Sequence, residues 1–298
     1  MTVRAWAELL RISALFTVPG DALAGAAAVG RRPDRSTALA MGASLCLYEA
    51  GMALNDWADR DEDAVDRPHR PIPSGRITPR AALTAACALT GAGLALAARA
   101  GRPALTVATG LAATVWAYDL RLKHTPAGPA AMAAARGLDV LLGATATGAG
   151  PAPAPAGARA ALPAAALLGA HTYAVTTVSR HEAQGGSATA PLAALASVVA
   201  VGGAVVRERR AQDANAPAGR LLLTALTGAY LRTTARPLTH AALNPSPPLT
   251  QRAVGSGIRA MIPLQAALAA RAGAAGSALA VMGLVPLARA LSRKVSPT

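Results

Sequence analysis

Apolar runs of about 17–20 residues follow one another along the whole chain, and short polar segments separate them. A helix of about 20 mostly apolar residues crosses the hydrocarbon core of a bilayer. The pattern therefore predicts an all-α, polytopic membrane bundle of nine or ten transmembrane helices. The runs cover residues 12–30, 38–56, 81–98, 103–119, 131–149, 160–178, 188–206, 218–235, 253–270 and 275–292. Because the run 253–270 contains Arg259 and Pro263, we expect it to be a partial or tilted span.

The breaks between the runs carry turn residues and charges, and none of them is long enough to hold a soluble domain. The segment PAPAPAGARA at 151–160 predicts an extended loop. The runs are rich in Ala and Gly, and such small residues allow helices to approach each other closely in lipid. We therefore expect one integral membrane domain over residues 1–298, with two polar cytoplasmic segments at 55–80 and 179–187.

The net charge of +14 does not indicate a nucleic-acid partner, because the arginines lie in short groups between apolar runs. Basic flanks of this kind are typical of membrane proteins at the headgroup level. With ten spans and the N-terminus inside, the excess of the 29 Lys and Arg residues falls on the cytoplasmic side. That side then carries the segments 55–80, 121–124 and 179–187, so three polar elements can converge on one cavity mouth.

Only 15 acidic residues occur in the chain, and six of them lie in the segment NDWADRDEDAVDRPHRPIPSG at 55–75. On a helix, the spacing of Asn55, Asp56, Asp59 and Asp63 places their side chains on one face. Like charges on one face repel, so local stability does not explain the pattern. A divalent cation does, because Mg²⁺ takes hard oxygen ligands and is typically completed by substrate phosphates.

Basic residues directly after the acidic ones suit a phosphorylated ligand. The guanidinium groups of Arg67 and Arg70 match phosphate oxygens in geometry and charge. The segment therefore predicts a diphosphate bridged by Mg²⁺, with an apolar tail lying among the helices. An ordinary charged loop, solvated by headgroups, is the alternative interpretation.

The stretch NDWADRDED matches the NDxxDxxxD signature of the UbiA superfamily of intramembrane prenyltransferases, and RPHRPIPSG resembles the RPxPSG tail of that motif. YDLRLK at 118–123 is similar to the Tyr and Lys element after the fourth span of the family. The resemblance implies a helical bundle around a central cavity that opens sideways to lipid. It also implies Mg²⁺-assisted transfer of a prenyl group from a prenyl diphosphate to an acceptor, which the sequence does not identify. Tyr118 and Lys123 are then catalytic residues.

The family carries a second Asp-rich motif after the sixth span, whereas this chain reads SRHEAQGG at 179–186. Glu182 is the only carboxylate there, and the resemblance implies that it holds or orients a second metal ion, with His181 or Gln184 as a neutral partner. Alternatively, Arg180 and His181 bind a phosphate without metal. SRHEAQGG together with RGLDVLLG at 136–143 resembles a subgroup associated with bacterial ebo-type gene clusters, so we expect a bacterial inner-membrane protein.

Two further interpretations remain open at this stage. Arg136 either contacts substrate in the cavity or pairs with Asp139 three residues later as a structural clip. The weakened second motif also favours a non-catalytic carrier that binds a diphosphate lipid. A transporter of another kind would show repeated span patterns with broken helices, and no clear repeat is seen.

Overall fold

The computed structural model describes residues 3–147, 155–183, 185–210 and 217–286, and within these ranges the regular structure is helical. Its elements are α1 (Val3–Leu9), a 3₁₀ helix (Ile12–Thr17), α2 (Pro19–Ala28), α3 (Arg35–Ala58), α4 (Arg60–Asp66), α5 (Pro79–Ala100), α6 (Arg102–Ala117), a π-helical turn (Tyr118–Leu122), α7 (Gly128–Thr145), α8 (Pro155–Arg159), α9 (Leu162–Ser179), α10 (Thr189–Arg210), α11 (Pro217–Leu243), α12 (Pro247–Arg271) and α13 (Ala275–Met282). The segments 148–154, 184 and 287–298 are outside the described residues, so parts of the predicted loop and of the last span are not tested.

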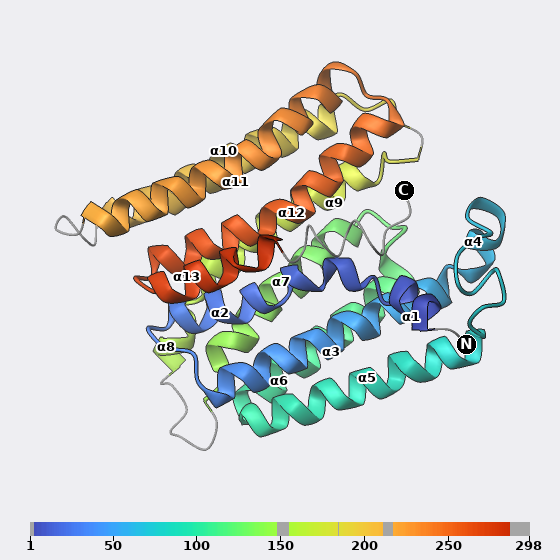
Figure 1. Cartoon of the computed structure of the whole chain (residues 1–298), viewed down its shortest axis with the longest axis horizontal. Helices are drawn as coiled ribbons and strands as arrows, with labels where there is room; N and C mark the ends of the chain where they lie inside the picture. The colour runs from blue at the N-terminus through green and yellow to red at the C-terminus, as the bar shows by residue number, and fades with distance from the viewer. Residues whose placement is uncertain (1–2, 148–154, 184, 211–216, 287–298) are drawn as a thin grey trace.

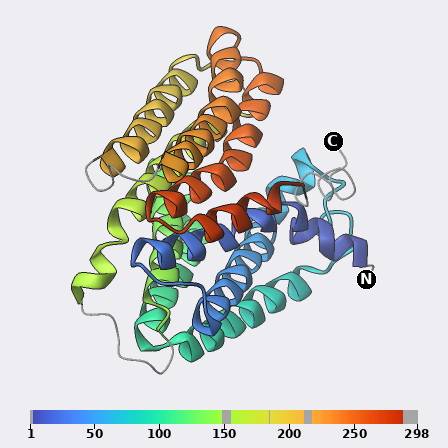
Figure 2. The ribbon, with the colours of Figure 1, turned by 60° about the vertical axis from the view of Figure 1, so that its left-hand side comes forward.

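The helices form one bundle in two halves (Figures 1 and 2). In the first half α3 packs on α5, and α6 packs on α5 and α7. In the second half α12 packs on α9 and α11, and α10 packs on α9 and α11. The two halves meet in the middle, where α2 packs against α7 and α12.

The contact between α2 and α7 depends on glycine. A Cβ atom on Gly143 would lie 2.2 Å from the carbonyl oxygen of Ala22, and one on Gly25 would lie 1.9 Å from the carbonyl oxygen of Val140. These are backbone atoms that no side-chain rotation can move away. The small residues therefore allow the two helix backbones to touch, as the composition predicts.

The first apolar run is not one helix. The expected span 12–30 consists of the 3₁₀ helix and the ten-residue α2, which begins at Pro19. Proline suits the first turn of a helix because its missing N–H would have no partner there. Arg11, just before the break, has a left-handed backbone with φ of 47°. The run is therefore not one continuous helix, and whether it crosses the membrane stays a prediction.

The run 253–270, expected to be a partial span, lies inside the 25-residue helix α12, whose central residues are buried. Pro263 lies within it and Pro237 lies within α11, which membrane helices tolerate where neighbours support the backbone. Within the described ranges five helices are long and apolar enough to cross a bilayer: Arg35–Ala58, Pro79–Ala100, Gly157–Ser179, Thr189–Arg207 and Pro247–Arg271. The count of nine or ten spans stays a prediction.

Helix α3 carries the acidic segment at its C-terminal end. It begins with a capping box, in which the Asp34 carboxylate accepts a hydrogen bond from the backbone N–H of Thr37 at 2.9 Å. It ends at Ala58, and α4 begins two residues later at Arg60. Asp59 lies between the two helices, so the acidic residues extend from the last turn of a spanning helix into a short second helix.

Candidate functional site

The acidic residues keep a helical register across the break at Asp59. The N–H of Asp59 donates to the carbonyl of Asn55 at 2.9 Å, and the N–H of Asp63 donates to the carbonyl of Asp59 at 2.8 Å. Asp56 and Asp63 are 4% and 3% exposed. Both carboxylates contact Arg70, at 3.4 Å and 2.7 Å, so they share one side of the segment.

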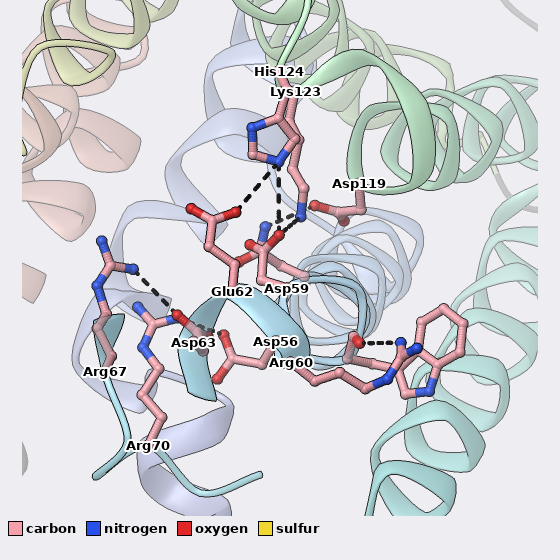
Figure 3. Close-up of polar contacts among 12 residues, drawn as sticks. Asp56, Asp59, Arg60, Glu62, Asp63, Arg67, Arg70, Asp119, Lys123 and His124 are labelled. Carbon is pink, nitrogen blue, oxygen red and sulfur yellow. Dashed lines mark hydrogen bonds and ion pairs between the residues drawn. The ribbon is translucent and has the colours of Figure 1, made fainter. Parts of the chain in front are cut away.

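Arginines neutralise these two carboxylates. Arg67 lies 3.6 Å from Asp63, and Arg11 donates to Asp56 at 3.1 Å (Figure 3 shows Arg67 and Arg70 beside Asp63). Arg67 and Arg70, predicted to bind phosphate, are therefore ion-paired with the acidic residues. The loop after α4 folds back over the segment, which explains why the basic residues that follow in sequence meet the acidic ones.

Asp59 contacts two other residues, Lys123 and His124, which lie in the segment after α6. The Lys123 ammonium forms an ion pair with its carboxylate, and His124 Nε2 lies 3.8 Å from the same oxygen and 4.0 Å from Glu62 (Figure 3). Ligand atoms of Asp59, Glu62 and His124 lie within 4.8 Å of one another. Glu62 and His124 were not among the predicted site residues.

The segment after α9 reaches the same region. Arg180 Nη1 donates to the carbonyl of Thr125 at 3.1 Å. Burial raises the pKa of Glu182, and the nearby charge of Arg67 opposes the rise. The convergence of the three polar segments is thus confirmed. The role of Glu182 as a metal ligand stays a prediction, as does the role of His181. Gln184 is outside the described residues.

A cavity of about 200 Å³ opens between α3, α6 and α7 directly beneath the polar segments. One face of α3 lines it from Asn55 back to Ser44, which is a length of about 16 Å at 1.5 Å per residue. Its middle is apolar and its mouth is polar. The lining residues at the mouth are Arg11, Asn55, Tyr118 and Asp119, and those of the apolar walls include Leu47, Met52, Leu111, Val115 and Met132.

Asp119 and Arg11 are site residues that the sequence interpretation missed. Asp119 is 4% exposed, and its carboxylate accepts a hydrogen bond from Asn55 Nδ2 at 3.1 Å. It lies in the π-helical turn Tyr118–Leu122, a wide turn that is often found at functional sites. An acidic residue at the end of an apolar run was the available signal, because such residues face protein interiors or cavities rather than lipid.

The deep end of the cavity is polar again, and its contacts correct one prediction. Arg136 does not pair with Asp139 in a clip; its guanidinium donates to Asp21 on α2 at 2.5 Å. Asp21 is fully buried and also accepts a hydrogen bond from Gln265 Nε2 at 2.7 Å. Asp139 accepts one from Ser44 at 2.6 Å. Arg136 and Asp139 both line the cavity, which agrees with the alternative prediction of a cavity role for Arg136.

Comparison with known proteins places the chain in a family. The model of the UbiA prenyltransferase family matches residues 13–206, which is more than half of the chain. The chain belongs to the UbiA prenyltransferase family. The family and the apolar helices together indicate an integral membrane protein.

Among curated UbiA relatives, digeranylgeranylglyceryl phosphate synthase of Methanopyrus kandleri is 37% identical over 129 residues, which cover 42% of this chain and 46% of that protein. The enzyme of the same name from Methanothrix thermoacetophila is 42% identical over 109 residues, which cover 36% and 41%. The matched stretch therefore spans less than half of these relatives.

Solved structures of UbiA homologues share the fold. The apo homologue from Aeropyrum pernix K1 superposes with a TM-score of 0.67 at 19% identity, covering 85% of this chain and 96% of that one. The homologue from Archaeoglobus fulgidus bound to GPP and Mg²⁺ superposes with a TM-score of 0.64 at 16% identity, covering 94% and 99%. At these identities the likeness establishes the fold.

The donor set of this UbiA chain fits a hard divalent cation. Asp56, Asp59, Asp63 and Asp119 supply carboxylate oxygens, and Asn55 adds an amide oxygen, which are the ligand types that Mg²⁺ prefers. Asp59 and Glu62 bring carboxylate oxygens close enough to share one ion. The arginines and Lys123 that now pair with these groups are suited to phosphate oxygens as well. The carboxylates of this cluster could therefore bind a cation while its basic groups bind phosphate.

Proposed function

We propose that this protein catalyses Mg²⁺-dependent transfer of a prenyl group from a prenyl diphosphate to an acceptor within the membrane. The observation that carries the proposal is the position of the acidic and basic cluster at the mouth of an apolar-walled cavity. A prenyl diphosphate has the matching shape, with a charged head and an apolar tail. Family membership supports the same chemistry.

The roles of the residues follow from their places. Asn55, Asp56, Asp59 and Asp63 would hold Mg²⁺, which supplies positive charge to the diphosphate when bound. Glu182 would hold or orient a second ion. The first ion would then lie on the α3–α4 segment, and the basic groups would bind the phosphates.

The basic groups would neutralise the charge that develops on the departing diphosphate. These groups are Arg67, Arg70, Lys123 and Arg180, with His181 at the rim. Tyr118 lines the mouth beside Asp119. The apolar walls would exclude water from the allylic cation.

The acceptor is not identified by the site. Digeranylgeranylglyceryl phosphate synthases are among the relatives, but they match this chain over less than half of their length. We propose that the three polar segments face the cytoplasm, because the Lys and Arg excess lies on their side. We also propose a bacterial inner membrane as the location, although the relatives described above are archaeal.

Replacement of Asp59 tests the metal site. Asp59→Ala removes a carboxylate from the middle of the cluster, so Mg²⁺-dependent binding of geranyl diphosphate in nanodiscs should be lost. Asp61→Ala is the matched control, because the Asp61 side chain is 86% exposed and pairs only with its neighbour Arg60 among the described contacts. Undiminished Mg²⁺-dependent affinity in a folded Asp59→Ala protein would overturn the metal assignment.

A non-catalytic carrier of a diphosphate lipid is the second candidate function. The observation in its favour is the segment 179–187, where Glu182 is the only carboxylate. A single-turnover assay with radiolabelled prenyl diphosphate separates the two functions. An enzyme releases diphosphate, and Glu182→Gln should slow this release by about 10²-fold or more while binding changes less. A carrier releases none, and the substitution alters affinity alone.

A further inference from the structure

Arg76 is a half-buried arginine in the loop between α4 and α5, and all three of its guanidinium nitrogens donate hydrogen bonds. Nη1 donates to Oε2 of Glu8 on α1 at 2.6 Å, Nη2 donates to the carbonyl of His69 at 2.6 Å, and Nε donates to Oγ of Ser74 at 3.0 Å. None of these partners belongs to the acidic segment 55–66. Because the guanidinium group is planar and rigid, three partners around it fix their positions relative to one another.

The bonds of Arg76 hold the backbone on both sides of Arg70. The carbonyl of His69, which accepts from Arg76, belongs to the peptide bond that leads into Arg70. The carbonyl of Arg70 itself accepts two hydrogen bonds from Ser74, from the hydroxyl at 2.6 Å and from the backbone N–H at 3.0 Å. The hydroxyl of Ser74 is in turn held by Arg76. Arg76 therefore fixes one of these carbonyls directly and the other through Ser74.

Helix α1 is the support to which this loop is tied. Leu9 of α1 is fully buried and belongs to the same apolar cluster as Ile72 and Ile77 of the loop, which are 7% and 0% exposed. Glu8, the neighbour of Leu9, is 17% exposed in its side chain and forms the ion pair with Arg76. Apolar packing and a partly buried ion pair thus join the loop to α1 at neighbouring residues.

Arg70 is the side chain whose position depends on this loop. Its guanidinium donates to Oδ2 of Asp63 at 2.7 Å and to Oδ1 of Asp56 at 3.4 Å, so it bridges the two buried carboxylates of the site (Figure 3). Arg70 lies outside the helices, so the contacts of the loop set the position of its backbone. A loop that moves away from α1 would carry Arg70 away from the place where the diphosphate is expected.

We propose that Arg76 is a positioning residue of the diphosphate site, which ties the loop 67–78 to α1 so that Arg70 meets the phosphate oxygens. This inference rests on the proposed function, since it takes Arg70 to be a phosphate ligand. Arg76 acts through the backbone of the loop and does not need to touch the ligand. A lysine in its place keeps the positive charge and can pair with Glu8. Its single ammonium group cannot reproduce the three-way fork, so the bonds that hold Arg70 are lost.

The test compares Arg76→Lys with Arg60→Lys in the purified full-length protein in nanodiscs with Mg²⁺. Arg60 is the matched control, because its side chain is 35% exposed against 37% for Arg76, and its described contacts are to its neighbours Trp57 and Asp61. Arg76→Lys should weaken Mg²⁺-dependent binding of geranyl diphosphate by about tenfold, as expected when a hydrogen bond to a charged group is lost. Arg60→Lys should bind like the wild type.

A double-mutant cycle with Arg70→Gln separates positioning from a general loss of stability. If Arg76 acts through Arg70, Arg76→Lys should cost little further affinity once Arg70 has been replaced, because the group that it positions is already gone. Additive losses in the double variant would show that Arg76 acts on another part of the protein, and the positioning role would be overturned.

Hydrogen exchange without ligand tests the loop itself. The backbone N–H groups of Arg70 and Ser74 donate within the loop at 2.9 Å and 3.0 Å, so they should exchange faster in Arg76→Lys and at the wild-type rate in Arg60→Lys. Unchanged exchange or unchanged affinity in Arg76→Lys would overturn the positioning role and leave the proposed function intact. If the wild type binds no geranyl diphosphate with Mg²⁺, the proposed function and this inference fail together.

Discussion

Gly51 offers a direct test of whether the cavity holds the prenyl tail. It lies one helical turn below Asn55 on α3 and lines the cavity. A Cβ atom on Gly51 would lie 3.0 Å from Cγ1 of Val115 and 3.9 Å from Oδ2 of Asp119, both of which line the same cavity. Gly51→Leu therefore directs its side chain into the space between α3 and α6, with its Cβ atom in contact with Asp119 at the edge of the cluster.

The size of the effect follows from the volume that the leucine occupies. Its four side-chain carbons displace a similar number of ligand carbons from the apolar walls. At about 0.8 kcal/mol for each buried methylene, the loss is about 3 kcal/mol, or roughly 10²-fold in affinity. Geranyl and farnesyl diphosphate should both lose this affinity. Dimethylallyl diphosphate should lose less, because the leucine lies about 6 Å below Asn55 at 1.5 Å per residue.

The assay is Mg²⁺-dependent binding of the three diphosphates in nanodiscs, with the melting temperature as the check on folding. Gly110→Leu is the matched control. Gly110 lies on the adjacent helix α6, and a Cβ atom there would meet nothing within 4 Å. Both substitutions gain about the same helix propensity, roughly 1 kcal/mol. If folded Gly51→Leu bound farnesyl diphosphate as tightly as Gly110→Leu did, the tail would not lie in this cavity.

Three further predictions concern the scaffold. Gly143→Ala places a methyl group against the backbone of α2, so it should cost about 3 kcal/mol of stability and lower the melting temperature; an unchanged value would contradict the close approach. Tyr230→Phe removes the hydroxyl 3.0 Å from Nδ1 of buried His171 and should cost about 1–3 kcal/mol, with ligand affinity unchanged. The hydrogen bond from Arg76 at 2.6 Å lowers the pKa of Glu8 below 4.5, so this pair stabilises the fold above that pH and is lost as the pH falls through the lowered value. Melting curves from about pH 6 to about pH 3 should therefore fall more steeply for the wild type than for Glu8→Gln, and parallel curves would refute the linkage.

The sequence by itself determined the class of fold and identified the acidic segment as the candidate site. Long apolar runs leave helices as the structure that satisfies the backbone in lipid, so the all-α bundle follows from their length. The acidic segment after the second run was recognisable because clustered like charges on one helix face need counter-ions. The buried His171 hydrogen-bonds to Tyr230 and to the carbonyl of Gly257, a pairing across three helices that its sequence position does not predict.

The tertiary structure decided which groups meet. Arg136 and Asp139 are three residues apart, a spacing at which opposite charges on a helix commonly pair. Asp21 on α2 nevertheless takes the guanidinium, because the glycines between α2 and α7 bring those backbones into contact. Sequence spacing carries no information about such a crossing.

At the polar mouth of the cavity, too, the sequence identified some residues and helix packing decided their partners. Lys123 was identified from its motif, but its neighbour His124 and the buried Asp119 became site residues only through the π-helical turn that widens the end of α6. Arg11, which reaches Asp56, stands in a left-handed turn between α1 and the 3₁₀ helix. The local sequence determines whether a segment is helical and which chemical groups it carries. Which oxygen meets which cation depends on helix crossings and breaks, and those are set by packing between segments far apart in the chain.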